Sequence, residues 1–338
     1  MTLYNKRREA LEVTIRLAVQ EDVPDIITLL IKQHGNYYAN VDLYSADFVR
    51  RVIKNRDLSI AVAECAGGLI AGMAGANGKT RFAGTLEWVM LTIRPSCRGF
   101  DIGRRLLSFL RQTLERDLYS CIYGHCMSLD TASQGIMAGL GFRMTGAILN
   151  CYRFDTHAEN FAGLDLPDKH RLLVVCLLGT KKHAGVLYVP DEHREYIQAV
   201  YEALGAEYTL DKEAKPSGTT AVTVTQNNEH RYCEVFAEET GPDFEKTLKD
   251  TLEQYGALEQ QSFNVFINLN DPAAPGACRI LEDRGFFFAG LHALSGACEY
   301  MIFHYSPALA VPFDRIAVLP GYAGEFAYIR DQYEKKGC

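Results

Sequence analysis

The chain has 338 residues, of which 48% are hydrophobic and 23% are charged, so its composition is globular and excludes a mainly disordered protein. At about 150 residues per domain, this length predicts two domains. The formal net charge of −7 argues against a general nucleic-acid binder, which needs a basic surface. The longest strongly apolar run, residues 172–178, is too short to span a bilayer, so we expect no membrane partner.

The ten cysteines are scattered along the chain, and none of them forms a CxxC pair. The N-terminal residues are charged and lack the apolar core of a signal peptide. We therefore expect a cytoplasmic, soluble protein with reduced thiols and without a metal site.

The first half of the chain alternates strand-like and helix-like segments. The strands are predicted over 13–19, 58–65, 69–76, 84–93, 119–129 and 143–154. The helices are predicted over 21–35, over 45–55 with Ser45 as the N-cap, from about Arg98 onward, and over 132–142.

A polar segment with Gly and Pro, residues 156–169, predicts the boundary between two domains, 1–157 and 168–338. Beyond it, strands are predicted over 171–178, 220–226, 231–237 and 263–270, with two further strand-like stretches near the end. Helices are predicted over 191–205, 242–256, 275–286 and 324–336.

One short pattern occurs in both halves. Residues 141–149, GFRMTGAIL, resemble residues 285–294, GFFFAGLHAL, and each begins with Gly-Phe and has a second Gly five positions after the first. An Asp precedes the helix before each copy, Asp130 and Asp271. We expect a duplicated fold, and two unrelated α/β halves are the alternative.

Residues 93–107, IRPSCRGFDIGRRLL, form the most informative segment, because a predicted strand ends there and a helix begins after a Gly-containing loop. Backbone N–H groups at such a helix start, together with the helix dipole, attract an anion such as a diphosphate. Neither the GxGxxG fingerprint nor the P-loop GK[ST] is present in this loop.

The segment resembles the phosphate loop of the GNAT superfamily of acyl-CoA-dependent N-acyltransferases. Arg98 and Gly103 match the ends of the family motif, Gly99 matches a frequent family Gly, and Asp101 stands where the family usually has the middle Gly. The resemblance covers about residues 13–150. It implies an α/β fold with a mixed α+β sheet in the N-terminal half and a duplicated GNAT-like unit in the C-terminal half.

The resemblance also implies an acyltransferase that moves an acetyl group from acetyl-CoA to an amine of a small molecule or protein by direct attack. Acetyl-CoA is then the co-substrate, with the pantetheine arm along the strand and the diphosphate on the loop. The implied binding residues are Leu91, Thr92, Ile93, Arg98, Gly99, Phe100, Asp101, Ile102, Gly103 and Arg104.

Glu87 is the candidate catalytic base, because some family members carry a Glu on this strand and because its parity places it on the face of Leu91 and Ile93. A salt-bridged edge carboxylate is the alternative. Met137 stands where many members have a Tyr as general acid, so Ser133, Tyr123 or water would protonate the thiolate instead.

His125 is a second candidate base, and a hydrogen-bonded structural His is its alternative. A covalent mechanism through Cys126 is a further alternative. Tyr37, Tyr38 and Tyr44 lie in the region that walls the acceptor site in the family, and they are either substrate-binding residues or packing residues between two helices.

The matching junction of the second half is acidic, with Glu238, Glu239 and Asp243, and has no Arg-Gly loop. We expect no CoA binding there, because acidic groups repel a diphosphate. Structural support, homodimer formation or shaping of the acceptor pocket are its candidate roles. The alternatives to the whole interpretation are a non-catalytic acyl-CoA sensor or interaction module, and an unrelated α/β ligand-binding protein.

Overall fold

The computed structural model describes residues 1–7, 9–35, 38, 40–82, 84–114, 119–153, 170–179, 183–292 and 299–336. The first half contains the strands β1 (Thr2–Tyr4), β2 (Ala10–Leu17), β3 (Leu58–Cys65), β4 (Ile70–Asn77), β5 (Thr85–Ile93), β6 (Cys121–Met127), β7 (Arg143–Arg153) and β8 (His170–Gly179). Its helices are α1 (Val23–His34), α2 (Ala46–Asn55), α3 (Ile102–Thr113) and α4 (Ala132–Gly139).

The second half contains β9 (His183–Leu187), β10 (Glu207–Leu210), β11 (Ala221–Asn227), β12 (Tyr232–Glu239), β13 (Ser262–Asn268), β14 (Phe287–His292) and β15 (Tyr300–Tyr305). Its helices are α5 (Arg194–Leu204), α6 (Phe244–Gly256), α7 (Ala274–Asp283) and α8 (Ala323–Lys335). β1, β9 and β10 were not expected from the sequence.

Local chemistry explains why the first helices begin and end where the sequence predicts. The Ser45 hydroxyl accepts a hydrogen bond from the Phe48 N–H at the start of α2. α1 ends at Gly35, whose positive φ of 61° is easily adopted by a residue without a Cβ. These two features confirm the predicted cap and the predicted stop.

Thirteen strands form one mixed sheet with the order β1-β2-β3-β4-β5-β6-β8-β7-β14-β15-β13-β12-β11, while β9 and β10 form a separate parallel pair. This architecture confirms the predicted α/β fold class with a mixed sheet. The run β4-β5-β6-β8-β7 of the first half and the run β11-β12-β13-β15-β14 of the second have the same connectivity, and each has its parallel contact between the second and third strand. This correspondence is consistent with the expected second unit.

β8 lies where the sequence did not place it. The strand follows the predicted boundary at 156–169, yet it pairs antiparallel with β6 on one side and with β7 on the other. We therefore propose that the N-terminal unit extends through β8, and that residues 171–178 belong to it rather than to the second unit.

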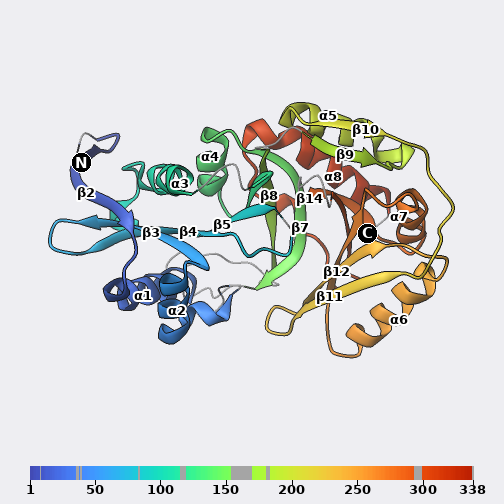
Figure 1. Cartoon of the computed structure of the whole chain (residues 1–338), viewed down its shortest axis with the longest axis horizontal. Coiled ribbons are helices and arrows are strands. Elements are labelled where there is room, and N and C mark those ends of the chain that lie inside the picture. The colour runs from blue at the N-terminus through green and yellow to red at the C-terminus, as the bar shows by residue number, and fades with distance from the viewer. Residues whose placement is uncertain are drawn as a thin grey trace.

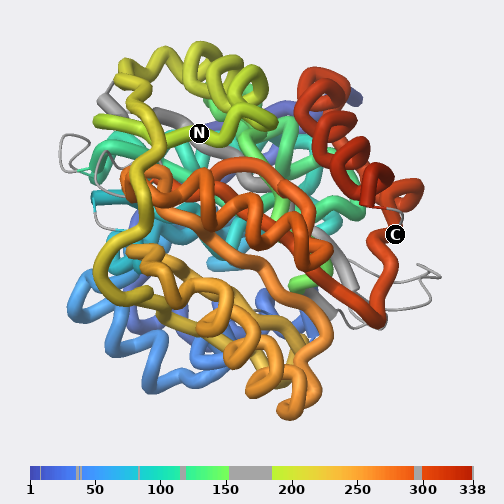
Figure 2. The backbone as a smooth tube through the Cα atoms, turned by 90° about the vertical axis from the view of Figure 1, so that its right-hand side faces the viewer, coloured from blue at the N-terminus to red at the C-terminus, as the bar shows by residue number. Residues whose placement is uncertain are grey.

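The two halves meet in the middle of the sheet, where β7 lies beside β14 (Figure 1). In the first half α1 and α2 lie below the sheet and α3 and α4 above it, whereas in the second half α5 lies above and α6 below (Figure 1). The view turned by 90° agrees, with α5 and α8 along the top and α6 towards the bottom (Figure 2). The helices thus cover both faces.

Buried polar side chains tie the two halves together. The Asn264 amide donates to the Leu149 carbonyl and its oxygen accepts from the Leu149 N–H, while the Thr145 hydroxyl donates to the Leu291 carbonyl. The Gln134 amide of α4 donates to the carbonyl of Ala317, far along the chain. Because buried polar groups are costly without partners, these pairings fix how the halves sit together.

Candidate functional site

A cavity of about 1590 Å³ opens where β5 and β6 separate. The two strands pair in parallel only between Thr85–Trp88 and Cys121–Gly124, and beyond that point each continues without pairing to the other. The lining of the cavity includes residues of β5, β6 and the start of α3 from the first half, and residues of β12, β13 and β14 from the second. Both halves of the chain therefore build it.

A bulge shapes the β5 wall. Met90 has a positive φ of 59°, and the register between β4 and β5 shifts between Met73 and Gly75. The Met90 N–H donates to the Tyr38 hydroxyl oxygen at 2.9 Å, so that Tyr38 lies against the bulge. Burial raises the pKa of Tyr38 well above its usual value, and the hydroxyl keeps its proton.

The loop before α3 turns into the helix through two residues with left-handed backbone conformation. Gly99 and Asp101 both have positive φ, 85° and 62°, and no side chain caps the N-terminus of α3. The Asp101 carboxylate accepts hydrogen bonds from Arg104 and lies 3.6 Å from Arg105. The negative charge of Asp101 is thus compensated by two neighbouring guanidinium groups.

Most of the residues predicted to bind the co-substrate line this cavity. Arg98 hydrogen-bonds to the Gln33 amide oxygen and to the Ile93 carbonyl. Gly103 lies against α4, because a Cβ there would be 2.8 Å from Ile136 Cδ1. Phe100 is the exception, since it is buried and does not line the cavity. The lining residues of the predicted set are Leu91, Thr92, Ile93, Arg98, Gly99, Asp101, Ile102, Gly103 and Arg104.

Glu87 and His125 face each other across the junction of β5 and β6. His125 Nδ1 lies 3.3 Å from Glu87 Oε1, and both side chains are about one-fifth exposed, 20% and 23%. His125 Nε2 lies 3.0 Å from the Nε2 atom of His292, which comes from β14 in the second half. The structure thus brings the two predicted base candidates together and adds a histidine that the sequence analysis did not identify.

A further carboxylate, Glu234 of β12, lines the cavity near Glu87 and His125. Burial raises the pKa of Glu234 to about 6, with Glu87 adding to the increase and His125 and Arg81 opposing it. Arg81 lies 3.7 Å above the centre of the Phe236 ring. This end of the cavity is therefore both acidic and aromatic.

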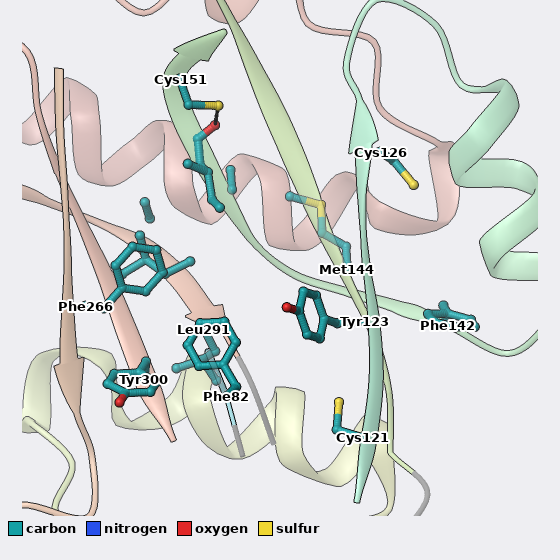
Figure 3. Packing of buried hydrophobic residues seen from close by; sticks show 14 of the residues in the cluster. Phe82, Cys121, Tyr123, Cys126, Phe142, Met144, Cys151, Phe266, Leu291 and Tyr300 are labelled. Carbon is teal, nitrogen blue, oxygen red and sulfur yellow. Dashed lines mark hydrogen bonds between the residues drawn. The ribbon is translucent and has the colours of Figure 1, made fainter. Parts of the chain in front are cut away.

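Aromatic rings surround that acidic end. The rings of Phe82 and Tyr123 lie 5.8 Å apart edge to face, and those of Phe236 and Phe266 stack at 4.3 Å. Phe82, Tyr123, Phe266 and Tyr300 come from different segments and gather in one cluster (Figure 3). Such faces attract cations as well as apolar groups.

The other candidate residues are divided between the cavity and its surroundings. Ser133 and Tyr38 line the cavity, as do Cys126 and Met137, both of which are buried. Tyr44 does not line it; its hydroxyl donates to the Gly35 carbonyl and accepts from the Tyr38 N–H. Tyr37 lies outside the described residues.

The sequence contained one signal for the overlooked histidine. In the repeated pattern, His292 occupies the position of Ile148, two residues after the second Gly. A polar residue in an otherwise apolar strand is a candidate for a site. Glu234 is a comparable case, because it is a charged residue between two apolar residues of β12, Cys233 and Val235. Neither position could be related to Glu87 without the sheet order.

At the corresponding strand-to-helix junction of the second half, before α6, the chain packs closely against itself. The Thr220 N–H and hydroxyl both donate to Asp243 Oδ1, which lowers the pKa of Asp243. A Cβ on Gly241 would come within 2.8 Å of the Thr220 nitrogen. The Asp243 carboxylate is thus occupied by Thr220, although α6, like α3, starts without a side-chain cap.

The described residues contain no group of three or more His, Cys, Asp or Glu side chains arranged to hold a metal ion. No helix in the described part of the chain is long and apolar enough to cross a membrane.

No protein-family model and no curated protein matches the chain. Solved structures of N-acetyltransferases match about half of it. An N-acetyltransferase from Staphylococcus aureus Mu50 is 18% identical, with 50% of this chain and 99% of that chain covered and a TM-score of 0.41. A GCN5-related N-acetyltransferase from Kribbella flavida is 19% identical, with 49% and 97% covered and a TM-score of 0.40.

The yncA protein of Salmonella typhimurium, solved with its cofactor acetyl-CoA, is 22% identical, with 53% of this chain and 98% of that chain covered and a TM-score of 0.41. In fold, this chain is similar to GNAT N-acetyltransferases over about half of its length.

Proposed function

We propose that this protein transfers an acetyl group from acetyl-CoA to an amine. The observation that carries the proposal is the layout of one cavity: an uncapped helix start with arginines at one end, the unpaired edge of β5 along its side, and the Glu87–His125 pair at the other end. A long co-substrate with a diphosphate, an amide-bearing arm and a reactive thioester fits that sequence of features.

The loop at 98–104 would bind the diphosphate through backbone N–H groups and through Arg98 and Arg104. The β5 edge beyond Trp88 would pair with the amides of the pantetheine arm, as a strand pairs with an extended peptide. This placement leads the thioester towards the bulge at Met90 and towards Glu87.

The chemistry then needs an uncharged amine and a place for its proton. The amine nitrogen attacks the thioester carbonyl carbon, a C–N bond forms, and the C–S bond breaks as the adduct collapses. The Glu87 carboxylate takes the proton that leaves the nitrogen, and the thiolate of CoA receives a proton from Ser133, Tyr123 or water. Holding both reactants in one cavity supplies much of the rate through orientation.

Two matched variants test co-substrate binding. Arg104→Glu reverses a charge in the first turn of α3, and Lys249→Glu makes the same change on the exposed surface of α6. Calorimetric titration with acetyl-CoA should show binding to the wild type and to the Lys249 variant, and at least tenfold weaker binding to the Arg104 variant. Equal affinity in all three would contradict the assigned diphosphate site.

Glu87→Gln tests the chemistry. Thiol release over a panel of amines should fall about 100-fold in this variant while the acetyl-CoA affinity stays within twofold, because a general base typically contributes that much. Unchanged turnover would exclude Glu87 as the base. Acetyl-CoA binding without thiol release from the wild type on any amine would favour the non-catalytic acyl-CoA sensor, for which Asp101 and Met137 are the supporting departures.

A further inference from the structure

The contact between His125 and His292 joins the two halves of the chain in the lining of the cavity. The two Nε2 atoms lie 3.0 Å apart, although the residues are separated by most of the second half in sequence. His125 also contacts Glu87, so a continuous line of hydrogen-bonding atoms runs from β14 through β6 to β5.

The proton positions along this line follow from the chemistry of its ends. An ionised Glu87 only accepts hydrogen bonds, so the His125 Nδ1 that faces it carries a proton. A neutral His125 then accepts at Nε2, and the proton between the two imidazoles belongs to His292 Nε2. This tautomer is assigned from the network rather than from observed hydrogens.

Its surroundings hold His292 in place. The residue is 2% exposed. The centre of its ring lies 4.5 Å from the centre of the Phe82 ring and 4.8 Å from the centre of the Tyr123 ring. Burial lowers the pKa of His292 well below 6.5, which keeps the ring neutral. His292 Nδ1 is buried and has no hydrogen-bond partner among the described residues.

We propose that His292 of the C-terminal half is the positioning residue of the base: by donating from Nε2 it fixes the tautomer and orientation of His125, and His125 in turn directs its Nδ1–H at Glu87. The second half thereby supplies part of the reacting machinery and not only a wall of the cavity. This inference rests on the proposed acetyl transfer, in which Glu87 is the base.

Two substitutions at one position separate a positioning role from a packing role. His292→Gln keeps a side-chain N–H donor, whereas His292→Leu removes it and keeps an apolar volume. The kcat of the Leu variant should fall tenfold or more with the acetyl-CoA affinity unchanged, and the acidic limb of the kcat–pH profile should shift. The Gln variant should recover most of the kcat.

The titratable groups that face this hydrogen-bonded line are Glu87, Tyr123, Glu234 and Tyr300.

A matched control is His304→Leu, which removes another fully buried histidine of the second half that does not line the cavity. It should lower stability without shifting the pH profile. Wild-type kcat and profile in a folded His292→Leu variant would overturn the proposal.

A readout independent of turnover covers the case in which a variant fails to fold or the wild type shows no transfer. Long-range ¹H–¹⁵N spectra of the histidine-labelled wild type should show protons on His125 Nδ1 and His292 Nε2, with the other two ring nitrogens bare. The reverse tautomers would overturn the proposal whatever the activity. Absence of transfer with the expected tautomers would instead count against the proposed function.

Discussion

Gly146 and Gly290 meet backbone to backbone at the junction of the two halves. They are the paired residues of β7 and β14, and a Cβ built on Gly290 would lie 2.2 Å from the Gly146 Cα. Both are the second Gly of the repeated sequence pattern. The same position in each copy has therefore become the point where the copies touch.

A methyl group at this contact should be strongly destabilising. Gly290→Ala introduces a Cβ that has no room and that also opposes a φ of +111°. We expect a loss of about 3 kcal/mol in the free energy of unfolding, from overpacking together with backbone strain. Denaturant titration measures it.

Gly324→Ala is the matched control, because Gly324 lies in α8 and an added Cβ would meet nothing within 4 Å beyond its own helical turn. That change should be neutral or stabilising by up to ~1 kcal/mol, since Ala favours a helix. Equal effects of the two substitutions would mean that the Gly146–Gly290 contact is not rigid.

Asp101 should weaken acetyl-CoA binding, because its ion pairs with Arg104 and Arg105 compete with the diphosphate for these side chains. Asp101→Asn keeps a residue type that tolerates the left-handed conformation and removes the charge. The dissociation constant for acetyl-CoA should fall about fivefold at low salt, or ~1 kcal/mol, and the gain should shrink at high salt. Calorimetry at two ionic strengths measures both quantities.

Asp191→Asn provides the comparison, since Asp191 makes the same i,i+3 ion pair with Arg194 at a helix start outside the cavity. Its effect on acetyl-CoA affinity should be nil. A similar gain in both variants would indicate a general charge effect and not release of the loop arginines.

Glu234 is expected to lower the stability of the folded protein and to help bind the amine acceptor. Its folded-state pKa is raised from 4.5 to about 6, so the ionised form is disfavoured in the folded protein. Glu234→Gln should therefore stabilise the protein by about 2 kcal/mol above pH 6, and the gain should vanish as the pH falls to 4.5. Thermal unfolding across this pH range tests it.

The same Glu234 variant should raise the KM for cationic amines, because it removes a carboxylate from the aromatic end of the cavity. Glu239→Gln, on an exposed position of the same strand, should change neither stability nor KM. If Glu234→Gln raised stability and left the KM of every amine unchanged, the acceptor would bind elsewhere.

His304 should make the fold acid-sensitive. Burial lowers its pKa to about 3, so between pH 6.5 and 3 the unfolded chain binds a proton that the folded protein does not. This single group should decrease the free energy of unfolding by about 1.4 kcal/mol per pH unit as the pH falls through that window. Unfolding of the wild type and of His304→Asn at pH 7, 6 and 5 should show a shallower dependence in the variant; equal slopes would contradict it.

Much of the first half could be predicted because its signals are local. The Ser45 cap, the stop at Gly35 and the change from strand to loop to helix around Arg98 depend on residues within a few positions of one another. The face of Glu87 was predicted wrongly, because the bulge at Met90 adds one residue to β5 and reverses the alternation beyond it. Trp88 packs in the same hydrophobic cluster as Leu91 and Ile93, so Glu87 lies on the opposite face from those two residues.

The parts of the fold and of the site that were not predicted depend on pairing between distant strands. The periodicity of hydrophobic residues does not show which strands pair. The place of β8 between β6 and β7 is decided by which strand edges are available. The contact of His125 with His292 depends in turn on β14 lying beside β7. Tyr44 illustrates the opposite case: its neighbourhood was predicted, while its two backbone hydrogen bonds direct it away from the cavity.

The late arrival of β14 has a consequence for synthesis. β7 is made well before the strand that lies beside it, and at typical elongation rates the delay is on the order of ten seconds. During that interval the far side of β7 offers unpaired backbone groups to any extended chain nearby. The nascent protein is thus most prone to aggregation after its first half has folded and before residue 290 emerges, so lower growth temperatures and chaperone supply should matter more for its yield than the stability of the finished molecule.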